Sequence, residues 1–332
     1  MNNKINVFIT IDTEHSIGGA FSKPSLKPVG NEKRIYGKIG NKYYGIPLIM
    51  DIADEYGIPL TFFVEVFNKY YFGEGETREV CEYILKRGHD VQLHLHPCWL
   101  NFKEPDPGKL RYKDNMSGYS LQEQVEMIAE GKDLIKKYTG KSPIAFRAGN
   151  YGADLNTLLA LKSNNLMIDS SYNAAFPLQS KRLYEQPIND AQIIEAIWEY
   201  PITCFKENLP FISRGLKPLD FNAASYLEMK STLNHVICRK FIKNMTFILH
   251  SFSFLRKEDS HYKNCQIRNN VVKRFENVCR YLSVNKNKLY CSNFSDFDIS
   301  NNQQLYQSRN SSFPEMFSII SVLRGIEQKI LK

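Results

Sequence analysis

The sequence predicts an α/β protein built as a distorted (β/α) barrel of about seven parallel strands. Short apolar strands alternate with helices along most of the chain, which is typical of a parallel sheet with right-handed crossovers. Polar side chains gather where the strands end, as they do at the carboxyl face of such barrels. An open doubly wound sheet is the alternative, but it would usually carry a glycine-rich phosphate loop after an early strand, and none is present.

The predicted strands are short runs of apolar and β-branched residues. A strand that is covered on both faces, as in a parallel sheet, is nearly continuous in its apolar side chains. Runs of this kind cover residues 5–11, 60–64, 88–96, 144–147, 166–169, 197–202, 245–249 and 289–291.

The predicted helices begin and end at residues with known capping preferences. A proline in the first turn and a glycine after the last turn predict a helix over 47–56. Ser120 and Glu123 form a capping box for a helix that ends at Gly140. Further helices are predicted from a cap at Thr77, from a cap at Asp154, over 221–243 and from a cap at Asn270. Loops are predicted over 16–45, 101–118 and 205–220.

Composition narrows the class of protein. The chain has 332 residues, of which 43% are hydrophobic and 23% charged, as in ordinary globular proteins. The net charge is +8, but the lysines and arginines are scattered and no nucleic-acid motif is present, so we expect no nucleic-acid partner. A basic rim that faces an anionic glycan, or the phosphate of a carrier, fits the charge equally well. No apolar run approaches the roughly 20 residues of a transmembrane helix.

The cysteines and the first residues indicate a compartment. The seven cysteines are widely spaced, odd in number and without a CxxC pair, which predicts free thiols in a reducing environment. The beginning of the chain lacks the long apolar core and cleavage site of a secretory signal. We therefore expect a cytoplasmic protein.

The end of the chain is predicted to be a separate extension. A stretch rich in Asn and Ser over 295–312 marks the end of the barrel, so we expect a barrel domain over 1–298 and an extension over 299–332. The extension contains an amphipathic helix over 313–332. This helix can dock on the barrel, join two copies of the chain as a homo-oligomer or lie on a membrane surface.

Four residues at two strand ends suggest a metal site. His94 and His96 are two residues apart on a strand, which places both imidazoles on one face, and Asp12 and Glu14 have the same spacing. One carboxylate and two imidazoles make a catalytic zinc site with an open fourth position. The remaining carboxylate is then available as a general base. Hydrogen-bonded histidines and an ion-paired carboxylate are the alternative interpretation.

Two further strands end in residues that suit the same chemistry. Arg147 can hold a base carboxylate ionised and aimed, although a surface ion pair explains it equally well. His250 can protonate a leaving group, although such a histidine is as often structural.

In these motifs the chain resembles the polysaccharide deacetylases with NodB homology, the family 4 carbohydrate esterases. The closest likeness is to the deacetylase-like proteins of surface-polysaccharide and lipopolysaccharide gene clusters. The matching segments stand in the family's order within residues 5–255 and cover 9–14, 60–64, 87–94, 146–147, 169–171 and 248–250. The resemblance implies a distorted barrel, a hydrolase activity on a linear C–N amide bond and one divalent metal ion, most simply Zn²⁺.

The resemblance also implies a role for each matching residue. Asp12 is the catalytic base and Arg147 supports it. Glu14 and His94 are metal ligands. His250 is the catalytic acid.

The chain departs from the family pattern around the metal site. Thr13 separates two acidic residues that are adjacent in the family. The family's second histidine falls on Cys98, so either His96 or Cys98 completes the site. We prefer His96, because catalytic deacetylase sites rarely use a thiolate. No counterpart of the family's Asp-and-Trp motif is found.

The expected function is a metal-dependent N-deacetylase that removes acetyl from an acetamido sugar of a surface glycan or its precursor. Tyr151, Asp169 and Trp99 are the candidates for substrate binding, and for the two aromatic rings core packing is the alternative. Two other functions stay open. One is a deacetylase-like barrel that binds glycans without turnover, and the other is a metal amidohydrolase that acts on a small non-sugar amide.

Overall fold

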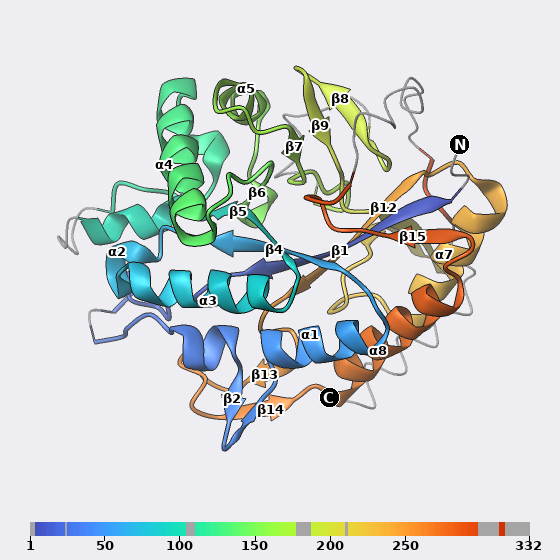
Figure 1. The fold of residues 1–332 in the computed structure, drawn as a ribbon, viewed down its shortest axis with the longest axis horizontal. Helices are drawn as coiled ribbons and strands as arrows, with labels where there is room; N and C mark the ends of the chain where they lie inside the picture. Colours follow the sequence, from blue (N-terminus) through green and yellow to red (C-terminus); the bar gives the residue numbers. More distant parts are fainter. Residues whose placement is uncertain are drawn as a thin grey trace.

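The structure is a computed structural model that describes residues 4–23, 25–103, 110–176, 187–209, 212–297 and 312–315. A curled sheet of mostly parallel strands lies at the centre, and helices cover its outer side (Figure 1). Across the sheet the strands follow the order β12 (Asn244–His250), β1 (Ile5–Thr13), β4 (Leu60–Glu65), β5 (Asp90–Leu95), β6 (Ala145–Ala148), β7 (Ile168–Asp169), β9 (Ile197–Glu199) and β8 (Gln192–Ile194). The strand β15 (Leu289–Cys291) pairs with the first residues of β1, and only β8 runs antiparallel to its neighbour among these described strands.

In the described residues, the connections between the strands carry the helices and three small hairpins. The helices are α1 (Ile46–Glu55), α2 (Lys69–Phe72), α3 (Glu74–Lys86), α4 (Leu121–Thr139), α5 (Leu155–Ser163), α7 (Tyr226–Arg239) and α8 (Asn269–Val284). Short 3-10 helices cover Pro97–Lys103, Met116–Gly118 and Gly149–Tyr151, and a π-helix covers Asn31–Ile35. The hairpins are β2 (Lys38–Ile39) with β3 (Lys42–Tyr43), β10 (Cys204–Leu209) with β11 (Ile212–Pro218), and β13 (Leu255–Lys257) with β14 (Cys265–Ile267).

The predicted parallel α/β fold is confirmed, and its distortion has a clear cause. No regular ladder joins β9 to β12 in the described part of the chain. Instead the amide of Thr203 donates to the carbonyl oxygen of Thr246 at 3.0 Å, and the amide of Leu219 donates to Thr203 at 2.8 Å. The amide of Ile248 then donates to Leu219 at 3.1 Å. Irregular backbone therefore spans this gap, and the sheet has the form of a half-barrel.

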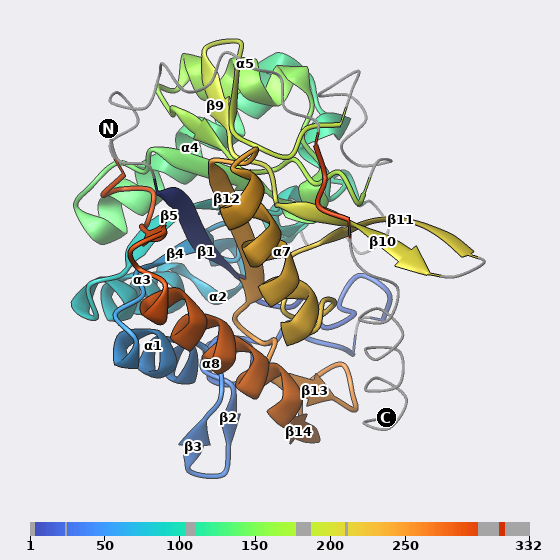
Figure 2. The same ribbon diagram turned by 90° about the vertical axis from the view of Figure 1, so that its right-hand side faces the viewer.

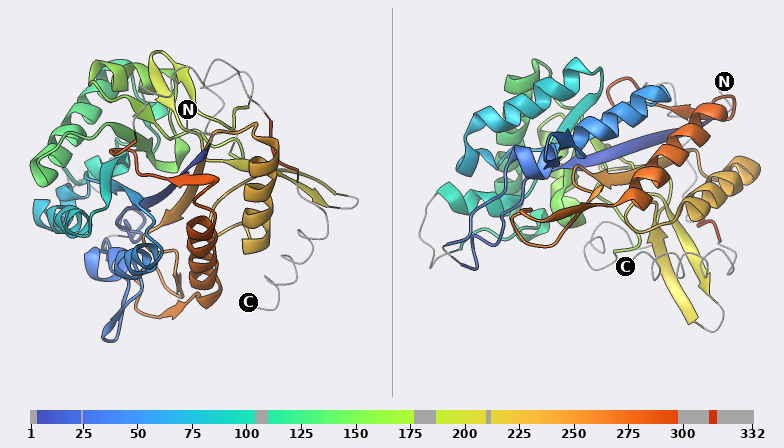
Figure 3. Two further views of the ribbon diagram at one scale, coloured as in Figure 1. Left: turned by 45° about the vertical axis from the view of Figure 1, so that its right-hand side comes forward. Right: turned by 90° about the horizontal axis from the view of Figure 1, so that it is seen from below.

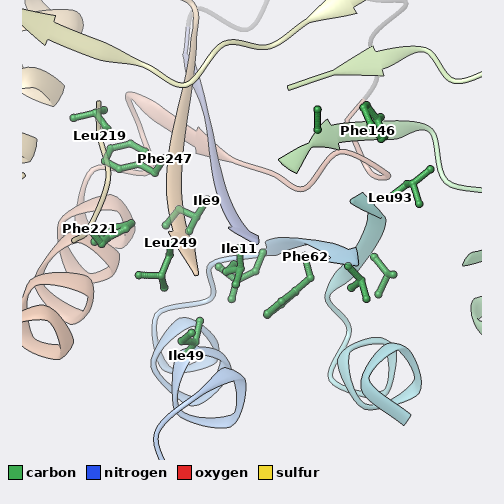
Figure 4. Close-up of a cluster of buried hydrophobic side chains, with 14 of the residues drawn as sticks. Ile9, Ile11, Ile49, Phe62, Leu93, Phe146, Leu219, Phe221, Phe247 and Leu249 are labelled. Carbon is green, nitrogen blue, oxygen red and sulfur yellow. The ribbon is translucent and has the colours of Figure 1, made fainter. Parts of the chain in front are cut away.

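Alternation along β1 sorts its side chains between two sides of the sheet. Ile9 and Ile11 pack toward the helices together with Phe62 and Leu249 of the neighbouring strands (Figure 4). Phe8 belongs to a separate cluster of aromatic and aliphatic side chains. Because successive side chains point to opposite faces of a strand, Asp12 lies on the same side as Phe8. Full burial of each large apolar side chain contributes about 1.5–3 kcal/mol, so the packing holds β1 in one register.

Most capping predictions are confirmed. Ser120 and Glu123 form the capping box of α4, which ends at Gly140 in the left-handed conformation (φ 75°). Asp154 caps α5 through the amide of Thr157.

The prediction was wrong for Thr77 and for Asn270. The helix α3 already begins at Glu74, so Thr77 lies inside it and its hydroxyl donates to Asn68 Oδ1 at 2.8 Å. The helix α8 begins at Asn269, and Asn270 lies within its first turn.

The loops predicted over 16–45 and 205–220 contain regular structure. The first includes the π-helix and the hairpin β2–β3, and the second forms the hairpin β10–β11. This second hairpin projects away from the central sheet (Figures 2 and 3). A hairpin outside the main sheet needs no long apolar run. The charged residues, glycine and prolines of 205–220 therefore suggested a loop.

Expectations about the end of the chain are tested only in part. The predicted domain boundary at residue 298 and most of the helix over 313–332 lie outside the described residues. The short described segment at 312–315 runs beside β10, where the amide of Lys206 donates to the carbonyl oxygen of Pro314 at 2.8 Å. All seven cysteines are free thiols and form no disulfide bond. Among the described residues, no helix combines the length and the apolar character needed to cross a membrane.

Candidate active site

Three side chains suited to a metal lie together at the carboxyl ends of β1 and β5. The Oε2 atom of Glu14 is 2.7 Å from His96 Nε2 and 3.7 Å from His94 Nε2. One possible ligand atom from each of these residues lies within 4.8 Å of the other two. The structure therefore brings together the three residues that the sequence suggested for a metal.

Both imidazoles are oriented by an acceptor behind the ring. His94 Nδ1 donates to the carbonyl oxygen of Arg147 at 2.7 Å, and His96 Nδ1 lies 3.0 Å from the carboxylate of Asp114. Carbonyl and carboxylate partners of this kind fix the ring and leave Nε2 as the ligand atom in zinc proteins. The donor set and its partners therefore fit a divalent metal such as zinc.

The acidic side chains around His96 also suit a cation. Burial opposes a proton on this ring, but Glu14 and Asp114 outweigh it and raise the pKa of His96 well above its ordinary value. A proton on Nε2 then occupies the position between His96 and Glu14. Metal binding to such a site replaces that proton, because the ligand atom must be free.

Glu65, which the sequence analysis did not single out, anchors the backbone of the histidine loop. Its Oε1 accepts from the amide of Phe67 at 2.5 Å, and its Oε2 accepts from the amide of His96. Burial raises the pKa of Glu65 to about 8. Glu65 ends β4, which pairs directly with the strand that carries His94. This position in the sequence could have indicated a carboxylate beside the histidines.

Asp12 forms a buried ion pair with Arg147. Arg147 Nη1 donates to Asp12 Oδ1 at 2.6 Å, and the guanidinium lies 4.2 Å from the ring centre of Phe63. Ser170 holds the other side of the guanidinium, where its carbonyl oxygen and hydroxyl each accept at 2.9 Å. Burial alone would raise the pKa of Asp12, but Arg147, His94 and His250 lower it below its ordinary value. Asp12 is therefore ionised and fixed, as a general base requires.

His250 stands next to Asp12 because β12 pairs with β1 in a register that places the two residues opposite each other. His250 Nε2 is 4.0 Å from Asp12 Oδ2, and the side chain remains 26% exposed. Asp220, which the sequence analysis also missed, pairs through its backbone with Ile248 and interacts electrostatically with His250. A partly exposed histidine beside a buried carboxylate can exchange a proton with a bound molecule.

Glu14 has a second, cationic neighbour that the sequence did not predict. Arg34, from the π-helix that precedes α1, donates from Nη2 to Glu14 Oε1 at 2.8 Å. Each acidic residue at the end of β1 is thus paired with its own arginine.

Of the three predicted substrate-binding residues, only Tyr151 is partly exposed. Tyr151 is half-buried, has a left-handed backbone (φ 56°) and stacks on Phe176 with 5.3 Å between ring centres. It also lies close enough to Asp12 to raise its own pKa through that charge, after the larger effect of burial.

Asp169 and Trp99 lie in the interior instead. Asp169 is fully buried and accepts from Ser171 Oγ at 2.6 Å, and it interacts with the buried carboxyl of Glu199. Trp99 is 1% exposed and packs against Phe72 and Phe102, so its ring has no face open to a sugar.

Cys98 belongs to a second group of polar side chains. It lies with His96 and Asp114 on the other side of the His96 ring. Burial raises the pKa of the Cys98 thiol, so in the absence of a metal this side chain is a neutral thiol.

Comparisons with known proteins define the class of fold. No protein-family model and no curated protein sequence matches this chain. A crystal structure from Mycobacterium smegmatis, described as a polysaccharide deacetylase, aligns with 95% of this chain and 96% of its own at a TM-score of 0.55 and 14% identity. The structure of a 4-alpha-glucanotransferase from Thermococcus litoralis aligns with 88% of this chain and 40% of its own, at a TM-score of 0.50 and 12% identity.

The chain therefore has the fold of NodB-like polysaccharide deacetylases, which confirms the family resemblance at the level of fold. At these identities the likeness extends to the fold alone. The two neighbours carry the names of different reactions, so the side chains must carry the functional argument.

Proposed function

We propose that this protein is a metal-dependent N-deacetylase that releases acetate from an acetamido sugar of a surface glycan or its precursor. The main support is the combination, at the carboxyl ends of β1 and β5, of an arginine-bound Asp12 with the group formed by Glu14, His94 and His96. A base beside a Lewis acid site is what hydrolysis of an amide requires.

The metal site in this proposal is made by Glu14, His94 and His96, with zinc as the ion. A divalent metal held there supplies a Lewis acid that polarises the acetyl carbonyl and lowers the pKa of water. The partners behind the two imidazoles support this assignment, since the backbone carbonyl of Arg147 accepts from His94 and the carboxylate of Asp114 accepts from His96.

The chain's own residues then divide the proton transfers. Asp12 takes the proton of the attacking water, while Arg147 holds the Asp12 carboxylate in place and ionised. His250 donates a proton to the nitrogen of the departing amine, so that the C–N bond breaks and acetate leaves. The 4.0 Å between His250 and Asp12 leaves both groups within reach of one amide.

The proposed substrate is a glycan whose sugar ring meets Tyr151. The stacked pair of Tyr151 and Phe176 supports this role, because aromatic faces pack well against sugar rings. The net charge of +8 supports an anionic glycan or a phosphate-containing carrier, and we keep the cytoplasm as the proposed compartment.

Metal analysis together with acetate release from acetylated amino-sugar oligomers tests the proposal. Asp12→Asn should lower acetate release by about 10²–10⁴-fold and leave bound zinc unchanged, because Asp12 acts as a base. His94→Ala should lose both zinc and activity. If Asp12→Asn also emptied the metal site, the roles of Asp12 and Glu14 would have to be exchanged.

A glycan-binding barrel without turnover is the second candidate. The departures from the family pattern favour it, because Thr13 separates the two acidic residues and Cys98 stands where the family has its second histidine. Glycan binding without any acetate release by the zinc-loaded protein would favour this second function.

A further inference from the structure

The two carboxylate oxygens of Glu14 have different partners. Oε1 accepts from Arg34 Nη2 at 2.8 Å, whereas Oε2 faces His94 and His96. Arg34 also donates from Nε to the backbone carbonyl oxygen of Glu14 at 3.2 Å. One guanidinium therefore holds both the side chain and the backbone of Glu14, which fixes the rotation of the carboxylate.

Arg34 is itself held by residues from a distant part of the chain. It is 8% exposed, and its guanidinium lies over the ring of Phe252 at 3.1 Å from the ring centre. Its Nη1 donates to the hydroxyl of Tyr262, which is 2% exposed and lies between β13 and β14. The hydroxyl of Ser251 donates to the carbonyl oxygen of Arg34 at 3.3 Å. Arg34 thus joins the segment that follows β1 to residues 251–262.

We propose that Arg34 is a positioning residue that makes Glu14 a ligand through a single oxygen, Oε2. This inference rests on the proposed function, because it assumes that Glu14 binds the metal. A planar guanidinium in a fixed orientation occupies Oε1 and prevents the carboxylate from turning both oxygens toward the ion. Glu14, His94 and His96 would then hold the ion through one donor atom each and would leave a coordination position open, as in catalytic zinc sites.

The charge around Glu14 agrees with this role. Three basic side chains lie against its carboxylate, with His96 Nε2 at 2.7 Å and His94 Nε2 at 3.7 Å from Oε2, and Arg34 Nη2 at 2.8 Å from Oε1. Arg34 is the one of the three that contacts Oε1, and it leaves Oε2 to the imidazoles. Residues that orient ligands in this way typically contribute about 10–100-fold to metal affinity.

Zinc affinity of the full chain, measured by competition with a chromophoric chelator, tests the inference without reference to catalysis. Arg34→Met removes the guanidinium that holds Glu14, with little loss of side-chain volume, and should weaken zinc binding by about 10–100-fold. Arg34→Lys keeps the charge but not the guanidinium and should restore only part of the affinity. The visible spectrum of the cobalt-loaded protein should change in Arg34→Met, because the coordination of the ion changes when Glu14 is free to turn.

Arg87→Met is the matched control. Arg87 bonds two carboxylates, Asp51 and Asp54, on the outer surface, so its loss should leave zinc affinity unchanged. Tyr262→Phe provides a milder variant if Arg34→Met does not fold. It keeps Arg34 but removes the hydroxyl that orients it, and zinc binding should weaken by a smaller factor in the same direction.

The outcomes separate this inference from the proposed function. Unchanged or tighter zinc binding in Arg34→Met and Tyr262→Phe would overturn the inference, and tighter binding would mean that Arg34 competes with the metal. Weaker zinc binding in the variants, with no acetate release by the parent protein, would support the role of Arg34 and reject the deacetylase. A parent protein that binds no zinc would reject both.

Discussion

Asp12 and Glu14 lie at the end of the same strand, but their arginines come from different parts of the molecule. Arg147 ends β6, which belongs to the same sheet, and it lies within a set of strand residues that includes Phe63. Arg34 comes from the long connection after β1 and is fixed by Phe252 and by the segment between β13 and β14. The proposed base, Asp12, is thus held by residues of the sheet, whereas the proposed metal ligand, Glu14, is held by residues of the loops.

This difference shows which residues of the site are positioned by strand pairing alone. Strand pairing fixes the relative heights of Asp12, His94, Arg147 and His250, since each stands at the end of a strand in one continuous ladder. The surroundings of Glu14 depend instead on contacts between segments more than 200 residues apart, such as Arg34 and Tyr262. We expect changes on the sheet side to affect proton transfer and changes on the loop side to affect metal affinity.

The largest expected effect is on the sheet side. Arg147→Met should lower acetate release at neutral pH by about 10²-fold, because Asp12 loses the group that orients it. Arg147 lowers the pKa of Asp12, so the loss of the guanidinium should raise that pKa. Because the base works only when it is ionised, the acid limb of the pH–rate profile should then move to higher pH. Zinc content should stay unchanged. An acid limb at the parent's position would break the assignment of Asp12 as base.

A smaller effect is expected on the loop side. Asp114→Asn keeps an acceptor for His96 Nδ1 but removes its charge, so zinc should bind about tenfold more weakly, the lower end of the usual range for such partners. Cys98→Ser is the matched control and should leave zinc affinity unchanged, because the proposed site uses Glu14 rather than the thiol. Loss of zinc from Cys98→Ser would move the metal to the group of His96, Cys98 and Asp114.

The smallest effect is expected one contact behind Arg147. Ser170→Ala removes the hydroxyl that accepts from Arg147 Nη2 at 2.9 Å, but the carbonyl oxygen of Ser170 remains as an acceptor. A lost hydrogen bond of this kind costs about 0.5–1.5 kcal/mol, so acetate release should fall by roughly twofold to tenfold. A drop as large as that of Arg147→Met would mean that the hydroxyl, and not the ladder, determines where Arg147 lies.

The sequence predicted the sheet side of the site well for a physical reason. Apolar runs define the strands, and parallel strands end at one edge, so the polar residues that follow them must meet there. Asp12, His94, Arg147 and His250 all follow this rule. Asp169 also ends a strand, but this strand is short and Ser171 bonds to the carboxylate. The rule predicted the place of Asp169 in the sheet but not that its side chain is buried.

The loop side could not be predicted in the same way. Arg34 lies in a polar stretch without periodicity, and nothing in the sequence signals that a π-helix would direct it toward Glu14. Asp114 and Asp220 lie in connections whose path depends on the whole fold. Trp99 could be assigned to packing only once its neighbours were known, because an aromatic ring suits a core and a sugar equally.

The aromatic cluster around Phe8 has a consequence for how the base exchanges its proton. Phe8 stacks on Phe294 with 4.7 Å between ring centres, and Tyr200 and Phe297 meet it edge-on. Phe8 lies four residues before Asp12 on the same side of β1, so these rings seal the interior below the carboxylate. If Asp12 is the proposed base, it exchanges its proton at the carboxyl end of β1, beside the partly exposed His250. A glycan bound there would separate Asp12 from bulk water, and the proton that Asp12 accepts would stay at the site until the product departs.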